Sequence, residues 1–188
     1  MSRSAVTDGV GTVPYGLTPQ PAAGQGPHRQ DPDAGLSAEL VTVVAAARRR
    51  ALRDGDRQID TAHLLHTLLE SDPEVRAVFD SGPRLARLLG YLVQRSIGYG
   101  LRWQSGVEDS GAVPVVTAPD AEGWSPVAAG ALDGARARAR RRGDAPARGV
   151  DLLAAMVAEP ESRAVEVLAR AGVDPHALLR RIDAACDL

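Results

Sequence analysis

The chain has 188 residues, a formal net charge of -2 and a hydrophobic content of 44%. A chain of this length can build one core of its own, and so small a charge gives no overall field that would draw it to nucleic acid or an anionic membrane. With only 2 Trp, 3 Tyr and 1 Phe, the core must consist of Ala, Leu and Val, which favours packed helices over a β-sandwich.

Several classes of function are excluded or disfavoured by what the sequence contains. All 22 basic residues are Arg, and a nucleotide-binding P-loop needs a Lys, so we exclude an ATP-driven motor within this sequence. The single cysteine, Cys186, cannot form an internal disulfide or a structural zinc site. No apolar run approaches the length of a membrane span. We therefore expect a cytoplasmic protein that is not an enzyme and binds no nucleotide, cofactor, metal or membrane.

The first half of the chain opens with a segment of different character. Residues 1–34 are rich in Gly, Pro, Gln and Asp without a hydrophobic period, so we predict a disordered tail. From Leu36 onward apolar residues recur at helical spacing, with Ser37 as the predicted cap and Gly55 as the stop. Further helices are predicted after Asp60 or Thr61, at Pro73, and after Gly82.

The second half shows the same pattern of helix caps, apolar spacing and helix breakers after an interruption. Residues 104–123 contain two prolines and few helix formers, which indicates a connecting loop. Ser125 and Pro126 then start a helix, an apolar stripe follows around Leu152, and Pro160 and Pro175 are predicted to open the last two helices.

An internal duplication links the two halves. Breakers and apolar positions recur 88 residues apart at four places: Ser37 and Ser125, Gly55 and Gly143, Asp56 and Asp144, and Leu64–Leu65 and Leu152–Leu153. We therefore predict an all-α fold of two tandem four-helix repeats, residues 35–103 and 124–188, joined by residues 104–123. The repeats should pack as a pseudo-twofold helical bundle with a groove between them.

These motifs resemble the Clp N-terminal repeat domain found at the head of ClpA and ClpC unfoldases. The resemblance rests on Leu36–Ser37 and Ile59–Leu65 in the first repeat, and on Trp124–Pro126 and Gly149–Leu153 in the second. It covers about residues 35–186. It implies a free-standing, non-catalytic module that binds a Clp unfoldase, its adaptors, or substrate proteins and peptides.

The resemblance also implies where a protein or peptide would bind. The candidate groove residues are Leu36, Ser37, Ala62, Trp124, Ser125, Asp133 and Val150. Trp124 is the best single anchor, although it could equally be a core plug between the repeats. In the family, a Glu at the positions of Ala62 and Val150 helps to hold phosphorylated arginine. We therefore expect hydrophobic or adaptor contacts here in place of phosphoarginine recognition.

Three alternatives remain at this stage. The protein could be a decoy that sequesters Clp adaptors or Clp-targeting ligands. Arginines on the first helix of each repeat could form a basic surface for nucleic acid, although the few aromatics and the negative net charge disfavour it. His63, His66 and Glu70 could share one helix face and hold a metal, but their spacing is not that of the usual helical zinc site, so we do not expect one.

Overall fold

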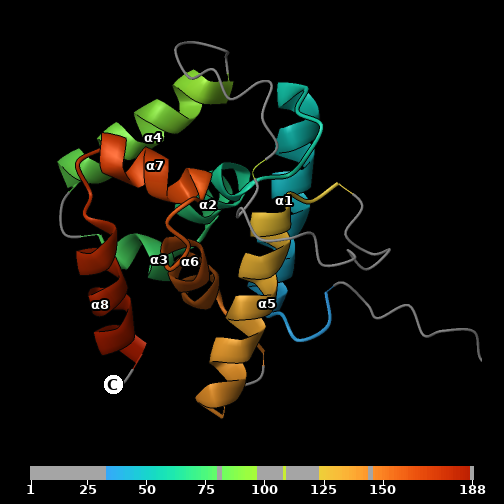
Figure 1. Cartoon of the computed structure of the whole chain (residues 1–188), viewed down its shortest axis with the longest axis vertical. Helices are drawn as coiled ribbons and strands as arrows, with labels where there is room; N and C mark the ends of the chain where they lie inside the picture. Colours follow the sequence, from blue (N-terminus) through green and yellow to red (C-terminus); the bar gives the residue numbers. More distant parts are fainter. Residues whose placement is uncertain (1–32, 80–81, 97–107, 109–122, 144–145, 187–188) are drawn as a thin grey trace, which may run out of the picture.

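The structure is a computed structural model that describes residues 33–79, 82–96, 108, 123–143 and 146–186 (Figure 1). Its described part contains eight α-helices and two isolated β-bridges, with no strand. This confirms the all-α prediction. The predicted tail, apart from its last two residues, and most of residues 104–123 lie outside the described residues. The helices are α1 (Ala38–Asp54), α2 (Thr61–Ser71), α3 (Pro73–Ala77), α4 (Gly82–Ser96), α5 (Pro126–Arg141), α6 (Gly149–Val157), α7 (Arg163–Arg170) and α8 (Pro175–Cys186).

Local sequence signals fix most of the helix starts. Ser37 and Ser125 cap α1 and α5, because each serine oxygen accepts a hydrogen bond from a backbone N–H three residues on, at 3.2 and 3.0 Å. Gly55 ends α1 with a left-handed φ of 71°, as predicted. The prediction for Pro160 was wrong by three residues: Pro160 lies in a turn, and α7 begins at Arg163 because Ser162 caps it.

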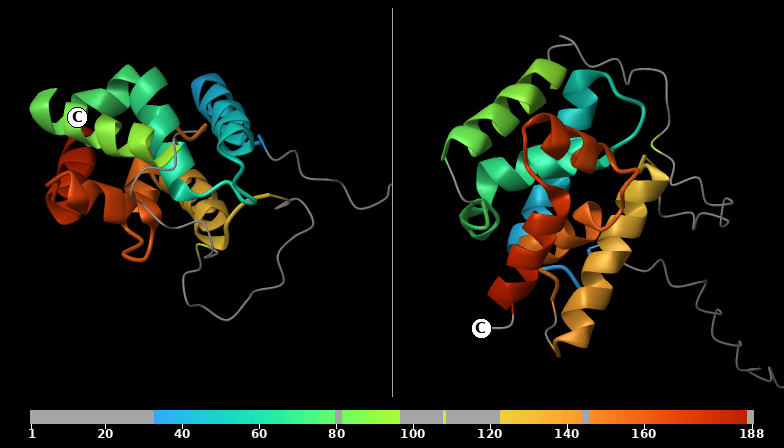
Figure 2. Two further views of the ribbon diagram at one scale, coloured as in Figure 1. Left: turned by 90° about the horizontal axis from the view of Figure 1, so that it is seen from above. Right: turned by 60° about the vertical axis from the view of Figure 1, so that its left-hand side comes forward.

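The core is shared by the two repeats. Helices α2 and α6 are its centre, with buried side chains along most of their length. Helix α1 packs on α2, α5 packs on α6, and both central helices contact each other. At one end α4, the last helix of the first repeat, lies against α7 of the second repeat (Figures 1 and 2). One continuous cluster of buried side chains therefore draws on both repeats.

The pseudo-twofold relation is visible in the two isolated bridges. Leu36 pairs with Ala147, and Ile59 pairs with Trp124, both in parallel. Leu36 and Trp124 stand 88 residues apart, as do Ile59 and Ala147. The two bridges are thus one contact made twice with the repeats exchanged. Each joins the segment before the first helix of one repeat to the segment before the second helix of the other.

None of the described helices is both long and apolar enough to cross a lipid bilayer.

Candidate functional site

The two bridges create a pair of junctions between the repeats. At the Ser37 junction the N-terminal ends of α1 and α6 meet beside α3, and the Ser37 N–H donates to the Ala147 carbonyl at 2.9 Å. At the Ser125 junction the N-terminal ends of α5 and α2 meet beside α7, and the Ser125 N–H donates to the Ile59 carbonyl at 2.9 Å. Helix N-termini carry unpaired N–H groups and a partial positive charge, so both junctions favour acceptor groups.

A carboxylate from outside the helices occupies the Ser125 junction. Glu108 is only 4% exposed. Its Oε2 accepts from the Thr61 N–H at 3.0 Å and from the Ser125 hydroxyl at 2.6 Å. Its Oε1 accepts from the Arg163 N–H at 2.7 Å and from the Thr61 hydroxyl. One side chain thereby satisfies donors at the start of α2, α5 and α7.

The Ser37 junction holds a carboxylate as well, but one that belongs to a helix cap. The Asp72 Oδ1 caps α3 by accepting from the Glu74 and Val75 N–H groups at 2.9 and 3.1 Å. Its Oδ2 lies against the start of α6, only 2.0 Å from where a Cβ on Gly149 would stand. A side chain at position 149 would therefore displace Asp72.

The Ser37 junction also opens into a pocket of about 400 Å³. Glu39, Glu74 and Asp72 give it an acidic rim, and Arg148 provides the one basic side chain in the lining, paired with Glu74 at 2.8 Å. The lining comes from both repeats: Ser37, Glu39, Thr42, Val43, Ser71, Asp72, Pro73, Glu74, Arg148 and Gly149. The pocket lies between the repeats, where the sequence led us to expect a groove, and its role in binding stays a prediction.

A buried ionic cluster lies next to the Ser125 junction. Asp60, fully buried at the start of α2, pairs with Arg95 of α4 and Arg163 at the start of α7. Burial alone would raise the pKa of Asp60, but the hydrogen bond and charge of His63, with the two guanidinium groups, hold that pKa far below its usual range. Asp60 is therefore a permanent anion that joins α2, α4 and α7.

The helical histidines take different partners from those considered for a metal. His63 Nε2 lies 3.0 Å from Asp56 and 3.8 Å from Asp54, while His66 Nε2 lies 3.2 Å from Glu70. The described side chains with metal-ligand geometry are thus Asp54, Asp56 and His63, without His66 or Glu70. The Arg95 guanidinium, 3.1 Å from Asp56, already supplies a positive charge there.

The predicted binding residues fall into two environments. Leu36, Ser37, Trp124 and Ser125 gather at the two junctions, where each is less than 10% exposed. Trp124, 7% exposed, belongs to the core cluster and lies under the Arg48 guanidinium at 5.5 Å.

The remaining predicted residues are either buried in the core or exposed on the surface of a helix. Ala62 and Val150, at 0% and 2% exposure, are buried in the first turns of α2 and α6, so their side chains reach no solvent. Asp133 is exposed on α5, where it pairs with Arg136 at 3.0 Å, and it lines neither junction. The role of these residues in binding stays a prediction.

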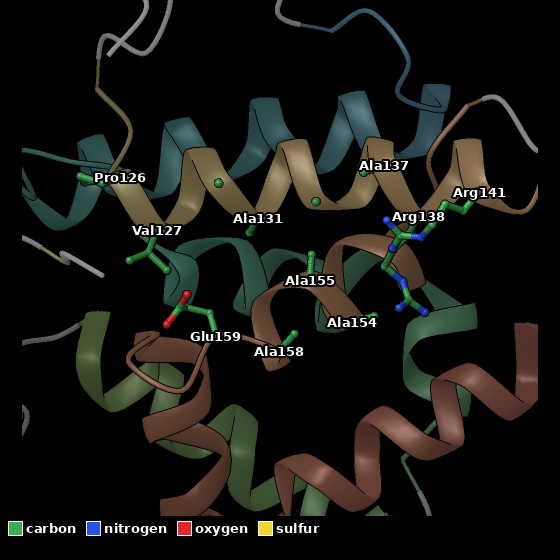
Figure 3. A pocket seen from close by; sticks show the side chains of 12 residues that line it. Pro126, Val127, Ala131, Ala137, Arg138, Arg141, Ala154, Ala155, Ala158 and Glu159 are labelled. Atoms are coloured by element: carbon green, nitrogen blue, oxygen red, sulfur yellow. The ribbon is translucent and has the colours of Figure 1, made fainter. Parts of the chain in front are cut away.

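A second surface groove runs between α5 and α6, within the second repeat (Figure 3). Its floor consists of small side chains, because α5 and α6 approach so closely that a Cβ on Gly134 would lie 3.1 Å from that of Ala155. Arg138 and Arg141 lie at one end of the groove and Glu159 at the other. Its volume is about 370 Å³.

Many arginines of the predicted basic surface are engaged within the molecule. Arg50 pairs with Glu70, Arg138 with Asp183, and Arg142 with Asp151. The last pair, with the backbone N–H of Arg148, lowers the pKa of Asp151 although burial alone would raise it. These arginines therefore hold helices together, which reduces the basic surface that nucleic acid could contact.

Comparisons with known proteins agree with this architecture. The family model of the Clp repeat (R) N-terminal domain matches residues 124–187, which span the second repeat. Comparison with curated protein sequences gives no match. The described part of the chain thus has the fold of a Clp N-terminal domain, and its second repeat is similar in sequence to the Clp repeat.

Three solved structures illustrate the likeness in fold. The N-terminal domain of the caseinolytic protease associated chaperone ClpD from Arabidopsis thaliana has 13% identity and a TM-score of 0.55, with 82% of this chain and 96% of that chain covered. The Hsp104 N-terminal domain from Candida albicans has 11% identity and a TM-score of 0.58, with 78% and 88% covered. A protein from structural investigations of a malarial protein secretion system has 14% identity and a TM-score of 0.58, with 81% and 95% covered.

Sequence reasoning missed Glu108, which makes four hydrogen bonds at the Ser125 junction. It stands in a segment without helical period, so no pattern singled it out. The offset between the repeats shortens to 87 residues here, where Pro73–Val78 matches Pro160–Val165, so the counterpart of Asp72 is the acidic Glu159 and the repeat spacing gave no signal for Glu108.

Proposed function

We propose that the protein is a non-catalytic binding module that receives proteins or peptides in connection with a Clp unfoldase. The observation that carries the proposal is the match of residues 124–187 to the Clp repeat family model. The double-repeat fold supports it, because that fold is shared with the N-terminal domains of ClpD and Hsp104.

The Ser37 pocket is the surface that we propose for the peptide. It lies between the repeats and has room for one or two side chains. Its rim carries the carboxylates of Glu39, Glu74 and Asp72 against the single guanidinium of Arg148. A peptide that presents a basic side chain would complement this charge, while Val43 and Pro73 offer an apolar floor.

Two modes of action follow from a binding module of this kind. In delivery, the module passes captured substrates to an unfoldase, and adding it to a reconstituted Clp protease should accelerate substrate turnover. In sequestration, the module occupies adaptors or ligands that would otherwise engage the unfoldase, and adding it should slow turnover. The direction of the change in degradation rate distinguishes the two modes.

The test compares three forms of the full-length protein as bait in extracts of its native cell. Thr42→Arg places a large cation in the Ser37 pocket, since Thr42 is exposed and lines it. Ala158→Arg is the matched control, because it puts the same side chain into the α5–α6 groove at another exposed position. We expect mass spectrometry to find a Clp unfoldase, adaptor or substrate with wild type and Ala158→Arg, and about tenfold less with Thr42→Arg.

Two results would count against the proposal. If Thr42→Arg and Ala158→Arg lower the recovery of Clp components equally, the Ser37 pocket is not the binding surface. If no form of the protein recovers a Clp component, the proposed link to a Clp unfoldase is wrong. Recovery of nucleic acid that disappears as salt rises, and is indifferent to Thr42→Arg, would replace it with the basic-surface hypothesis.

A further inference from the structure

A cleft of about 400 Å³ lies between the start of α4 and one face of α8. Arg84 of α4 lines one side, and Arg180 and Arg181 of α8 line the other. Asp174 is the one carboxylate among the described residues that line the cleft. We propose that this α4–α8 cleft binds an acidic segment of another protein through its guanidinium groups.

The positive charge of the cleft is not balanced from within. Arg84 and Arg180 are exposed, and neither forms an ion pair or a hydrogen bond with the part of the chain that the structure describes. Arg87 of α4 is exposed as well, and its Nη1 lies 3.7 Å from where a Cβ on Gly172, a lining residue, would stand. The cleft therefore concentrates cations in a chain whose net charge is -2.

The acidic residue of the cleft is already engaged. The Asp174 Oδ1 accepts a hydrogen bond from the His176 N–H, in the first turn of α8, at 2.9 Å. Helix stability does not account for Arg84 either, because the first turn of α4 contains no acidic residue and the helix dipole disfavours a cation there. An exposed cation at such a place favours a partner from outside the chain.

The lining also defines the chemistry of the ligand. A guanidinium group binds a carboxylate through paired N–H donors. Ala177 and Ala184, on the same face of α8 as the two arginines, give an apolar floor that suits the methylene groups of a glutamate side chain. No aromatic ring is among the described lining residues, so a nucleic-acid base has no surface on which to stack. The volume also exceeds what one inorganic phosphate ion fills.

The α4–α8 cleft differs from the Ser37 pocket in place and in charge. The two share no lining residue, and the pocket has an acidic rim. An acidic peptide is therefore attracted by the cleft and repelled by the pocket. Binding of such a peptide tests the cleft alone, and its outcome does not depend on the proposed link to a Clp unfoldase.

The test measures binding of fluorescein-labelled hexaglutamate to the full-length protein by fluorescence anisotropy, at pH 7 and low ionic strength. Wild type should bind this peptide and should not bind labelled hexaglutamine. Arg84→Glu combined with Arg180→Glu should weaken binding by about tenfold or more. The matched control, Arg49→Glu combined with Arg53→Glu, makes the same change of charge at two exposed positions of α1, and its affinity should stay within about twofold of wild type.

A neutral variant keeps the proposal falsifiable if charge reversal unfolds the protein. Arg84→Gln combined with Arg180→Gln should also weaken binding, and circular dichroism checks that it keeps its helices. Equal weakening by the α1 control, or equal affinity of wild type and the neutral variant, overturns the proposal. So does displacement of the labelled peptide by inorganic phosphate as readily as by unlabelled hexaglutamate, which would assign the cleft to a compact anion. Tighter binding of labelled oligothymidine that is lost in the neutral variant would assign it to single-stranded nucleic acid, and overturns it as well.

Discussion

The two junctions between the repeats have the same backbone frame but different side-chain chemistry. At the Ser37 junction, Asp72 lies against the start of α6 and an acidic pocket of about 400 Å³ stays open. At the Ser125 junction, Glu108 fills the space and is 4% exposed. Duplication has therefore given the molecule two equivalent places, of which one is accessible and one is occupied from within. Symmetry of the fold does not imply two equal binding sites.

The comparison extends to the helices that start at each junction. The cap position of α2 is Asp60, which is buried and pairs with Arg95 and Arg163. The corresponding position of α6 is Arg148, which is partly exposed and pairs with Glu74 on the surface. The occupied junction thus lies over a buried ionic cluster, and the open junction is bordered by a surface ion pair.

The largest expected effect on stability comes from removing the side chain of Asp60, the buried residue of this pair. Asp60→Ala removes the side-chain cap of α2 and a buried carboxylate partner of two arginines, and should lower the free energy of unfolding by about 3 kcal/mol. Arg148→Ala, at the equivalent place, should cost less than about 1 kcal/mol, because its ion pair is exposed. Urea denaturation of both variants measures the difference. Equal costs would show that the buried cluster does not distinguish the junctions.

A smaller effect concerns an ionisable side chain that only one repeat buries. His66 of α2 is 2% exposed, while its counterpart 88 residues on is Ala154. Burial, followed by the charge of Arg50, lowers the pKa of His66 to about 4 despite the opposing charges of Glu70 and Asp54. As the pH falls, His66 therefore binds a proton near pH 6.5 in the unfolded state but only near pH 4 in the folded state.

The free energy of unfolding should consequently be highest above pH 6.5 and fall by about 2 kcal/mol as the pH drops toward 4. Urea denaturation at pH 7, 6, 5 and 4 measures this slope. His66→Gln removes the titrating group and should flatten the slope across this window. A slope that His66→Gln leaves unchanged would assign the pH dependence to other groups.

The smallest effect compares Asp72, which caps α3, with Pro160, which lies in the turn before α7. Asp72→Ala removes the cap of α3 and should cost about 1 kcal/mol, because two backbone N–H groups lose their acceptor. Pro160→Ala should change stability by less than about 0.5 kcal/mol, since Ser162 caps α7 and Glu108 supplies the carboxylate. Thermal unfolding of both variants checks the contrast. A large cost for Pro160→Ala would mean that the turn before α7 matters more than its cap.

Much of the fold could be predicted from the sequence because its determinants are local. Helical spacing of apolar residues, serine and aspartate caps, and the left-handed Gly55 placed the helices, and the spacing of 88 residues revealed the duplication. Pro160 misled the prediction because proline is common in the first turn of a helix, whereas here Ser162 satisfies the N–H groups that start α7.

The site was less accessible because its determinants are distant in sequence. Periodicity cannot show that Ile59 pairs with Trp124 or that Glu108 reaches Arg163, since both contacts join residues 55 or more positions apart. Trp124 illustrates the same limit. Its type suited either an anchor or a core plug, and only the packing around it, with Arg48 over its ring, places it in the core cluster.

The exchanged bridges have a consequence for how the molecule folds. Each bridge closes only when a segment of the first repeat meets a segment of the second, so neither repeat completes its own helix starts alone. Loops of 65 and 111 residues must close before either bridge forms, which makes folding slow and joins the two halves in one transition. Amide protons of Ser37 and Ser125 should then exchange with deuterium at one common rate under native conditions, although they belong to different repeats.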